Sequence, residues 1–498
     1  MNEALRVAKN TVAMSVGKLW MIVGNMIFTV VIARRLGLAG FGGYVSLIAL
    51  YELFRGLVAQ GISIFITREI VKDRARTSLY LSNSLLLTTI LAVFAAGIVF
   101  LMTRSSAYSP EAQQASLVVG LALLPATAVI LHEALLIAYE RMEFITVMTV
   151  AESGLRIVLS LLVLWQDMGL PALLAVLVFT QSLMLLGYRL LISRRLHRLR
   201  WQPSLPFTRT LARDGMILTV QTGLATVSPR FGTLALTYLV GSTAVGLYAA
   251  AGKLLRLTTF IDSYRDAIFP SLARLTEMPQ NAFRQVLEKS FKYLLTAFLP
   301  MTVGIAVLAD RFIFLFFPPE YAGAIILLQF MTLGLPFKVF IPLLSRGLIA
   351  LGDQRLSLRV TTVQTVIGIV LVVAFVIWMG PLGIVVAGFV TSTVGLVLLN
   401  YYLSRRLVRV NYGKVMIRPV LAAATMGVAA YFMHDWHLLF VVPACALVYL
   451  AALVIFRVIP PEEWKLIQQT LQAGIRKAGR VVASNVWVGD VCYKFTKR

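Results

Sequence analysis

The sequence predicts an all-α, polytopic membrane protein with about fourteen transmembrane helices. Two observations on composition lead to this fold class: 59% of the 498 residues are hydrophobic and only 14% are charged, against roughly 25% charged residues in soluble domains. The third observation is the arrangement of the apolar residues. They form successive segments of about 20 residues, which is the length that spans the hydrocarbon core of a bilayer.

Fourteen segments meet this length criterion. The first follows a few basic residues, but it is too long for a signal-peptide core and runs into Arg34 and Arg35 without a small-residue cleavage site. We therefore interpret it as a span. In chain order, the predicted spans cover residues 10–33, 41–67, 79–103, 112–139, 144–166, 170–192, 212–240, 244–270, 290–317, 322–351, 357–379, 382–404, 415–434 and 437–459.

The connections between the spans differ sharply in charge. The even-numbered connections are all basic, whereas the odd-numbered connections hold only Arg34, Arg35, Arg104 and Arg311. The positive-inside rule therefore places the even-numbered connections and both termini in the cytoplasm. Most of the formal net charge of +24 then reflects membrane topology, and we expect no nucleic-acid partner.

Residues 461–498 follow the last span and predict a basic amphipathic tail. Trp464, Ile467 and Leu471 recur at helical spacing, and Lys465 lies elsewhere around the helix. This pattern is typical of a helix that lies on the cytoplasmic membrane surface. A frayed, solvated tail is the alternative.

The cysteines and histidines form no metal-binding pattern. Cys445 lies in a span and Cys492 in the tail, and neither has the spacing of a ligand pair. The segment HDWH at 434–437 comes nearest to one, and we interpret it as a short turn capped by polar groups. The sequence predicts neither a metal nor a cofactor.

A short motif occurs twice in the chain. Gly37, Gly42 and Tyr44 in LGLAGFGGY recur at constant spacing as Gly241, Gly246 and Tyr248 in VGSTAVGLY. Residues 123–144 also resemble residues 334–358. Spans one to six therefore match spans seven to twelve, as in transporters built from two lobes around a central cavity. The predicted organisation is an N-lobe at 1–200, a C-lobe at 201–410, two further spans at 411–460 and the tail at 461–498.

Charged residues inside the predicted spans are the main functional signal, because ionisable groups at bilayer depth are costly and typically face a cavity. The eighth span holds several. Lys253 and Arg256 have no acid within one helical turn, which is typical of ligand-binding cations. Asp262, Arg265 and Asp266 neutralise one another, so plain structure, a gate or an ion site all fit them.

Three other spans carry a cation on a polar face. These are Lys18 in the first span, Arg55 with Glu52 in the second, and Arg230 beside Pro229 in the seventh. Polar faces also serve as contacts between helices, but a cation on each of them favours a cavity. Glu152 and Arg156, one turn apart, predict a structural ion pair. In the repeat register Glu52 corresponds to Arg256, so a pair between these two is a further expectation.

The spans carry a surplus of positive charge. The cations are Lys18, Arg55, Arg156, Arg230, Lys253, Arg256, Arg265, Lys338 and Arg346, and the acids are Glu52, Glu133, Glu152, Asp262 and Asp266. A positive cavity suits an anion, and the arginine fork matches phosphate oxygens, so a diphosphate is the expected ligand. Two explanations fit the acids equally: they are counter-ions of the arginines, or they bind H⁺ or Na⁺ and couple transport to an ion gradient. We find no enzyme motif, because GLYAAAGKL at 246–254 lacks the spacing and the hydroxyl of a nucleotide loop.

Residues 9–70 resemble the start of the Wzx-like oligosaccharide flippases of the polysaccharide transporter family. The matched features are Asn10, the ARRLG and FGGY segments within 33–44, Gly61 with Arg68 at the end of the second span, and ALG at 350–352. This resemblance implies a relation to multidrug and toxin extrusion exporters and lipid II flippases. The implied fold is two six-span bundles in a V shape plus two additional spans.

The resemblance also implies a function. The expected substrate is an undecaprenyl-diphosphate-linked oligosaccharide, moved from the cytoplasmic to the outer leaflet of the inner membrane by alternating access. Membrane lipids and the polysaccharide polymerase machinery are the expected partners, with H⁺ or Na⁺ as coupling ion. In lipid II flippases, cations of the first, second and eighth spans face the lumen. The comparable residues here are Lys18, Arg55, Lys253 and Arg256, with Lys18 standing where an arginine is usual.

Two other functions are alternatives. A drug/ion antiporter of the same fold prefers cationic drugs and hence an acidic lumen, which the surplus of positive charge opposes. A membrane-embedded glycan polymerase or ligase needs a sizeable external loop with catalytic arginine or histidine. The odd-numbered connections are all short. We therefore expect Lys18, Arg55, Arg230, Lys253 and Arg256 to bind substrate, and Glu52, Asp262 and Asp266 to couple an ion or form a gate.

Overall fold

The computed structural model describes residues 3–105, 107–196, 200–255, 280–350, 353–406 and 412–458. Every regular element in these ranges is helical, which confirms the all-α fold class. Ten of the described helices are long and apolar enough to cross a membrane, and Met416–Phe432 forms a shorter apolar helix. The predicted tail at 461–498 lies outside the described residues.

The helices follow the predicted spans closely. In chain order they are α1 (Glu3–Lys72), α2 (Thr77–Thr103), α3 (Pro110–Ala138), α4 (Met142–Trp165), α5 (Gly169–Arg195), α6 (Leu205–Leu239), α7 (Ser242–Leu255), α9 (Gln280–Val307), α10 (Ala309–Phe316), α11 (Ala324–Leu333), α12 (Leu335–Ala350), α13 (Gln354–Met379), α14 (Pro381–Arg406), α15 (Tyr412–Phe432) and α16 (Leu438–Ile455). Two short 3₁₀ turns, η1 (Arg74–Arg76) and η4 (Pro319–Tyr321), lie between them.

The first two predicted spans share one element, α1. Gly37 interrupts it with φ 67° and ψ 179°, a conformation that glycine adopts at little cost because it has no Cβ. The residues on either side are helical, so α1 consists of two consecutive helices. The predicted boundary between the first and second spans, at 34–40, contains this glycine.

Two predicted spans are interrupted in the structure. The predicted span at 290–317 is divided between α9, which ends at Val307, and α10, which begins at Ala309. The predicted span at 322–351 is divided at Gly334 between α11 and α12. Pro336 lies at the start of α12 and has no backbone N–H, so it cannot continue the hydrogen bonding of α11. Leu333 and Leu335 on either side of Gly334 are apolar, so hydropathy alone gave no sign of this second break, whereas the first lies next to Asp310 and Arg311.

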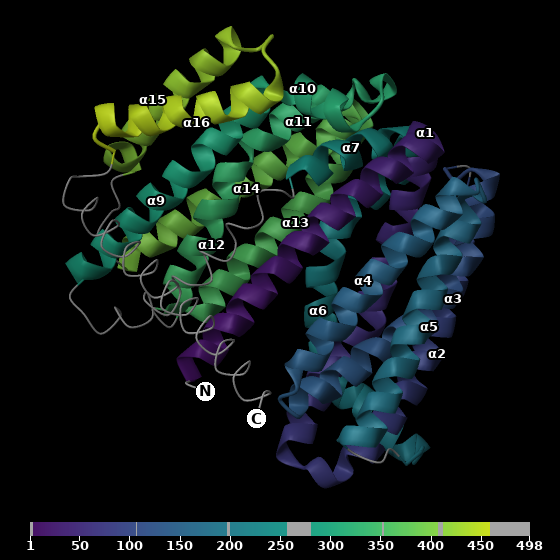
Figure 1. Ribbon diagram of the computed structural model, residues 1–498. Coiled ribbons are helices and arrows are strands. Elements are labelled where there is room, and N and C mark those ends of the chain that lie inside the picture. The colour runs from purple at the N-terminus through teal and green to yellow at the C-terminus, as the bar shows by residue number, and fades with distance from the viewer. Residues whose placement is uncertain are drawn as a thin grey trace, which may run out of the picture. The chain divides into compact units, whose positions relative to one another are not determined.

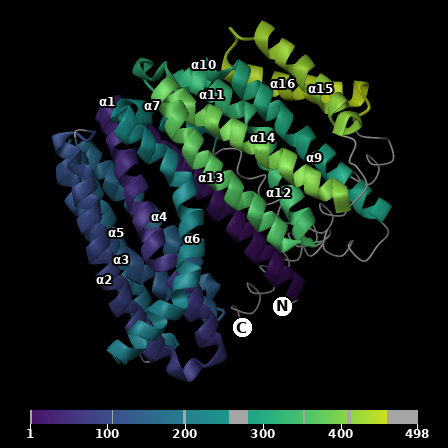
Figure 2. The same cartoon turned by 180° about the vertical axis from the view of Figure 1, so that it is seen from behind.

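The described helices belong to two compact units. One unit contains residues 1–20, 285–307 and 410–498, and the other contains residues 21–284 and 308–409. In the first unit, α15 and α16 lie side by side in both views (Figures 1 and 2). The Tyr449 hydroxyl of α16 donates a hydrogen bond of 2.7 Å to the Thr296 carbonyl of α9. The division into lobes at 1–200 and 201–410 stays a prediction.

The second unit contains the candidate site. There α2, α3 and α5 lie side by side in Figures 1 and 2, as do α13 and α14. Small side chains such as Ala95 of α2 and Ala122 of α3 fill the contacts between helices, which lets the backbones approach closely. Large apolar side chains such as Phe94 lie on the outside of the helices, as expected where they face lipid.

Polar contacts fix the start of α6, the helix that carries Arg230. Asn83 of α2 accepts hydrogen bonds from the Ser204 N–H at 2.7 Å and from the Thr208 hydroxyl at 2.9 Å. Its side-chain amide donates to the Gln202 carbonyl at 3.0 Å. The connection before α6 is therefore fastened along α2, which sets the position of α6 within the unit.

Candidate functional site: two chambers and a shared ion pair

Two neighbouring cavities lie in the second unit. The first, which we call the basic chamber, has a volume of about 830 Å³ and is lined by α1, α3 and α6. The second, which we call the aromatic chamber, has a volume of about 570 Å³ and is lined by α1, α4, α5, α6, α7, α11 and α14. Glu52, Pro229 and Arg230 line both chambers. These three residues therefore form a shared wall.

An ion pair between Glu52 and Arg230 bridges α1 and α6 in this shared wall. The side chains are 37% and 33% exposed, so both are open to the chambers. Further along α1 from Glu52 the two helices approach closely, because Gly61 of α1 packs directly against the backbone of Thr219 in α6. This close approach gives a physical reason for Gly61, which the sequence singled out only by resemblance.

The basic chamber surrounds Arg55. Its Nε is buried, and no hydrogen-bond partner for it occurs among the described residues. Glu133 of α3 lines the same chamber and accepts a hydrogen bond from the Tyr188 hydroxyl at 3.2 Å. A buried N–H without a partner costs free energy, so an acceptor atom from a ligand would be stabilised at Arg55.

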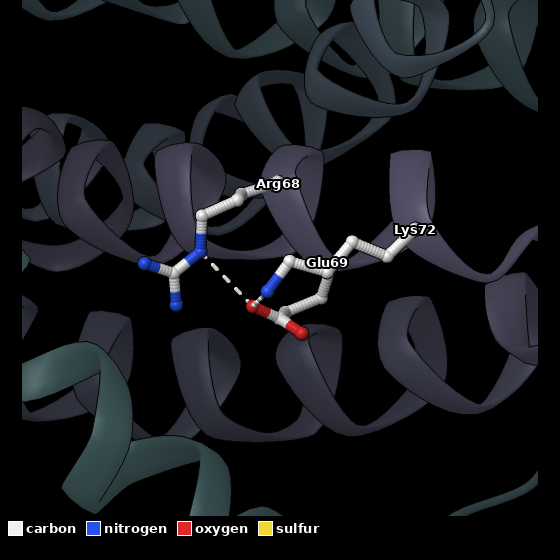
Figure 3. A network of polar contacts seen from close by, with 3 residues as sticks. All are labelled: Arg68, Glu69 and Lys72. Carbon is white, nitrogen blue, oxygen red and sulfur yellow. Dashed lines mark hydrogen bonds and ion pairs between the residues drawn. The ribbon is translucent and has the colours of Figure 1, made fainter.

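The basic chamber reaches Arg68, near the end of α1 that the sequence predicts to be cytoplasmic. Figure 3 shows Arg68 and Lys72 around one carboxylate oxygen of Glu69. Arg68 Nε donates to this oxygen at 3.0 Å and Lys72 Nζ at 2.9 Å. Arg68 is exposed, so it presents positive charge at this end of the chamber.

The aromatic chamber has a different lining. Its rings come from both halves of the predicted repeat and are Phe28, Phe41, Tyr44, Tyr51, Tyr248, Phe330 and Phe389. Polar side chains line this chamber as well, among them Asn25, Thr233 and Lys253. The Tyr51 hydroxyl is buried and has no hydrogen-bond partner within the described part of the chain.

Arg156 adds a cation to the aromatic chamber. Its Nε lies 3.6 Å from Glu152, which confirms the predicted ion pair on α4. Glu152 also accepts a hydrogen bond from the Thr180 hydroxyl of α5 at 3.1 Å. The spacing of the two residues predicts the pair, but the position of Arg156 beside the chamber depends on how α4 packs, which the spacing does not determine.

The two copies of the repeated glycine motif meet beyond the aromatic chamber. A Cβ on Gly42 would lie 1.8 Å from the Ser242 carbonyl oxygen, and one on Gly246 would lie 2.5 Å from the Leu38 carbonyl oxygen. The Ser46 and Thr237 hydroxyls pair nearby at 2.8 Å. Side chains larger than hydrogen do not fit at this contact, so the part of α1 that follows its kink at Gly37 is packed tightly against α7. Gly37 and Gly241 both have positive φ, which supports the predicted repeat.

The structure brings together four of the predicted site residues. Glu52, Arg55 and Arg230 line the basic chamber, and Lys253 lines the aromatic chamber together with Glu52 and Arg230. Lys18 belongs to α1, in a stretch whose side chains are not among those described. The other predicted site residues, Arg256, Asp262 and Asp266, lie outside the described residues. The expected pair between Glu52 and Arg256 therefore stays a prediction, while Glu52 is paired with Arg230.

Sequence reasoning did not include three charged residues of the chambers in the site. In the sequence, Arg68 follows the second predicted span, Glu133 is one of the intramembrane acids, and Arg156 is predicted as the structural partner of Glu152. Among the described residues, the chambers are lined by five cations, Arg55, Arg68, Arg156, Arg230 and Lys253, against two acids, Glu52 and Glu133. The surplus of positive charge predicted for the spans is thus present in the chamber walls.

A protein-family comparison identifies the family. The family model described as polysaccharide biosynthesis protein matches residues 7–276, which is more than half of the chain. The chain belongs to this family. The matched region contains all but the first residues of α1 and the whole of α2 to α7, and so includes both members of the Glu52–Arg230 pair. A search of curated proteins finds no match to the chain.

Solved structures share the fold of this family member. A lipid II flippase, MurJ, in an inward closed conformation is similar with a TM-score of 0.74 and 14% identity, over 90% of this chain and 98% of that one. An inward-facing multidrug resistance MATE transporter gives a TM-score of 0.56 and 18% identity, over 77% and 95%. MATE in a bent conformation gives 0.50 and 17%, over 81% and 98%. The protein is therefore a multi-pass membrane protein with a MurJ- and MATE-like transporter fold.

Proposed function

We propose that this protein is a flippase for an undecaprenyl-diphosphate-linked oligosaccharide. It moves the saccharide headgroup from the cytoplasmic to the outer leaflet of the inner membrane, with both termini in the cytoplasm, for synthesis of a cell-surface polysaccharide. Membership of the polysaccharide biosynthesis protein family and the flippase-like fold support this proposal. The chemistry of the chambers supports it independently.

The observation that carries the proposal is the position of Arg55. Its buried Nε lacks a partner among the described residues, in a chamber that extends to the exposed Arg68. A diphosphate entering from the cytoplasmic end would first meet Arg68 and then reach Arg55 and Arg230. Arginine donates in a planar fork that matches phosphate oxygens, so each step would add charge-assisted hydrogen bonds.

The Glu52–Arg230 pair gives the proposed transport cycle a switch. A diphosphate at Arg230 would compete with Glu52 for the same guanidinium, because both present anionic oxygens. Release of Glu52 would open the wall shared by the chambers and leave its carboxylate free to take up H⁺ or Na⁺. We further propose Lys18 and Arg256 as substrate-binding cations, and Asp262 and Asp266 as gate or ion-coupling residues.

Alternating access requires one end of the chambers to close while the other opens. The tight contact of Gly42 with Ser242 fits a chamber that is closed at the end facing the odd-numbered connections. The exposed Arg68 fits a chamber that is open at the cytoplasmic end. In the proposed cycle these contacts separate when the headgroup is released to the outer leaflet. The lipid tail would stay in the bilayer throughout.

The proposal is tested by replacing Arg55 with glutamine in purified protein reconstituted into liposomes. We expect Arg55→Gln to lower the rate of lipid-linked oligosaccharide flipping by about a hundredfold, since a charge-assisted contact of roughly 1.5–3 kcal/mol would be lost in binding and in transit. Arg104→Gln is the matched control, because Arg104 is exposed and lines neither chamber. Equal rates for the two variants would contradict the role of Arg55.

A drug/ion antiporter is the second candidate, and the rings of the aromatic chamber favour it. Aromatic linings also bind apolar, cationic drugs. The five cations against two acids around the described chambers oppose such ligands. Deletion of the gene should leave drug susceptibility unchanged if the protein is a glycolipid flippase, and increase susceptibility to cationic drugs if it is an antiporter.

A further inference from the structure

The two chambers lie in sequence along a single face of α1. Four lining residues precede Arg55 by three, four, seven and eleven positions, which is the spacing of one helical face; they are Glu52, Tyr51, Ile48 and Tyr44. Arg55 belongs to the basic chamber, Tyr44, Ile48 and Tyr51 to the aromatic chamber, and Glu52 to both. A ligand extended along this face would therefore meet charge first and aromatic rings next.

The distances along this face are short. At a rise of about 1.5 Å per residue, Tyr51 lies about 6 Å along the helix from Arg55, and Tyr44 about 16 Å. A group joined directly to a diphosphate held at Arg55 would thus begin at Tyr51 and extend past Tyr44. In a lipid-linked oligosaccharide that group is the sugar chain.

The aromatic chamber has the chemistry that sugar rings require. A pyranose ring presents faces of C–H groups, which pack against aromatic rings, and edges of hydroxyls, which both donate and accept hydrogen bonds. Pockets with an apolar, aromatic lining and a few placed polar groups are typical of small-molecule sites. Phe28 and Tyr44 meet edge to face, with 6.4 Å between ring centroids, so Tyr44 is held in place by its neighbour.

The Tyr51 hydroxyl is a buried polar atom of this chamber that has no partner among the described residues. The Arg156 Nε makes no hydrogen bond there either, but it lies 3.6 Å from Glu152 in an ion pair. Buried polar groups are normally paired, and an unpaired one calls for a reason. A sugar hydroxyl that exchanges a hydrogen bond with Tyr51 would satisfy it.

The repeat supplies rings from both halves of the chain. Tyr44 and Tyr248 occupy equivalent positions in the two copies of the motif and line the same chamber, one from α1 and one from α7. Both follow the glycine contact of Gly42 with Gly246 by two residues. Movement that separates these glycines would separate the two tyrosines as well, so binding of a sugar between them would be linked to the state of that end.

We infer that the aromatic chamber is the saccharide subsite, in which Tyr44, Tyr51 and Tyr248 bind the first sugar residues while Arg55 binds the diphosphate. This inference rests on the proposed flippase function and adds which chamber recognises the sugar. It also assigns a reason for the wall of Glu52 and Arg230, which lies where the diphosphate joins the first sugar.

The test is a binding competition on the purified full-length protein, followed by native mass spectrometry. The two probes are bare undecaprenyl diphosphate and the pool of lipid-linked saccharides extracted from a producing strain that lacks this gene. We expect the wild-type protein to prefer the saccharide-linked lipids. The variant Tyr44→Leu/Tyr248→Leu should lower this preference by about tenfold and leave the binding of bare undecaprenyl diphosphate unchanged.

Two further variants separate recognition from structure. Tyr44→Phe/Tyr248→Phe keeps both rings and should keep most of the preference. Tyr51→Phe removes only the hydroxyl and should lower the preference about fivefold. Should the leucine variant fail to fold, the Tyr51→Phe result still decides, because this substitution keeps the ring and the packing.

Each remaining outcome has a distinct meaning. Equal binding of both probes by the wild type would overturn the saccharide subsite and leave the flippase proposal standing. Binding of neither probe would overturn the proposed function itself. A leucine variant that weakens both probes alike, or a Tyr51→Phe variant with unchanged preference, would also overturn the assignment of the aromatic chamber.

Discussion

The basic and aromatic chambers share a wall but differ in how their polar groups are satisfied. In the basic chamber, a charged guanidinium nitrogen, Arg55 Nε, lacks a hydrogen-bond partner among the described residues. In the aromatic chamber, the neutral hydroxyl of Tyr51 lacks one. A charged donor selects for an anion, whereas a neutral hydroxyl between rings selects for a polar, uncharged group. One face of α1 therefore presents two different recognition chemistries, separated by a single ion pair.

The largest expected effect comes from locking the closed end beyond the aromatic chamber. The Ser46 and Thr237 hydroxyl oxygens are 2.8 Å apart, so Ser46→Cys/Thr237→Cys in a background without Cys445 and Cys492 should form a disulfide. Oxidation should abolish flipping, because α1 and α6, which carry the two cysteines, can no longer separate at this end. The measurement is the flipping rate in liposomes before and after reduction.

The disulfide should not affect ligand binding in the basic chamber. Bare undecaprenyl diphosphate should bind the oxidised and reduced forms with similar affinity, since Arg55 and Arg68 lie on the other side of the Glu52–Arg230 pair. Each single cysteine variant is the matched control and should flip normally under both conditions. Full flipping by the cross-linked protein would contradict alternating access at this contact.

The next effect concerns the boundary between the chambers. Glu52→Gln removes the partner of Arg230 and raises the net charge of both chambers, so we expect bare undecaprenyl diphosphate to bind about fivefold more tightly and the flipping rate to fall about tenfold. The exchanged variant Glu52→Arg/Arg230→Glu restores an ion pair and should recover most of the rate.

Glu133→Gln is the control for this boundary prediction. It removes the same charge from the basic chamber, away from the shared wall. We expect a similar gain in binding with little loss of rate. If Glu52→Gln and Glu133→Gln reduce the rate equally, total charge and not the boundary pair governs transport, and the comparison between the chambers loses its basis.

The smallest effect concerns the support of α6. Asn83→Ala removes hydrogen bonds to Ser204, Thr208 and Gln202, and a buried network of this kind is worth about 1–3 kcal/mol. We expect a lower midpoint of thermal unfolding and a flipping rate reduced a few-fold, because Arg230 is less well placed. Ser84→Ala is the control, since the buried Ser84 hydroxyl has no hydrogen-bond partner among the described residues. A variant of Asn83 as stable as that control would contradict the role of the network.

The sequence predicted helix positions well because spanning a bilayer imposes a length that hydropathy reveals. It did not predict the interruption at Gly334, because the flanking residues are apolar on both sides and a break changes packing without changing composition. The repeated glycines were found as a pattern, and their mutual contact follows only from how α1 and α7 cross. Glu52 corresponds to Arg256 in the repeat register, which stays a prediction, and its partner among the described residues is Arg230, which α6 brings from 178 residues further along the chain.

Some residues of the two chambers could be predicted from the sequence as site residues, and others could not. Arg55, Arg230 and Lys253 were predicted because a cation inside a span is conspicuous by its type alone. Tyr51 and Arg156 were not predicted as site residues, since an aromatic ring in a span is ordinary and Arg156 already had Glu152 as a partner. Their part in the site depends on which helices surround the aromatic chamber, and that is tertiary information.

The most direct measurement of the central claim is the leaflet in which the lipid-linked oligosaccharide lies in cells that lack this protein. In a deletion strain, radiolabelled oligosaccharide lipid should accumulate in the cytoplasmic leaflet, wild-type protein should restore it to the outer leaflet, and Arg55→Gln should fail to do so while Arg104→Gln succeeds. Outer-leaflet oligosaccharide lipid at the wild-type level in the deletion strain, with no other flippase expressed, would contradict the account.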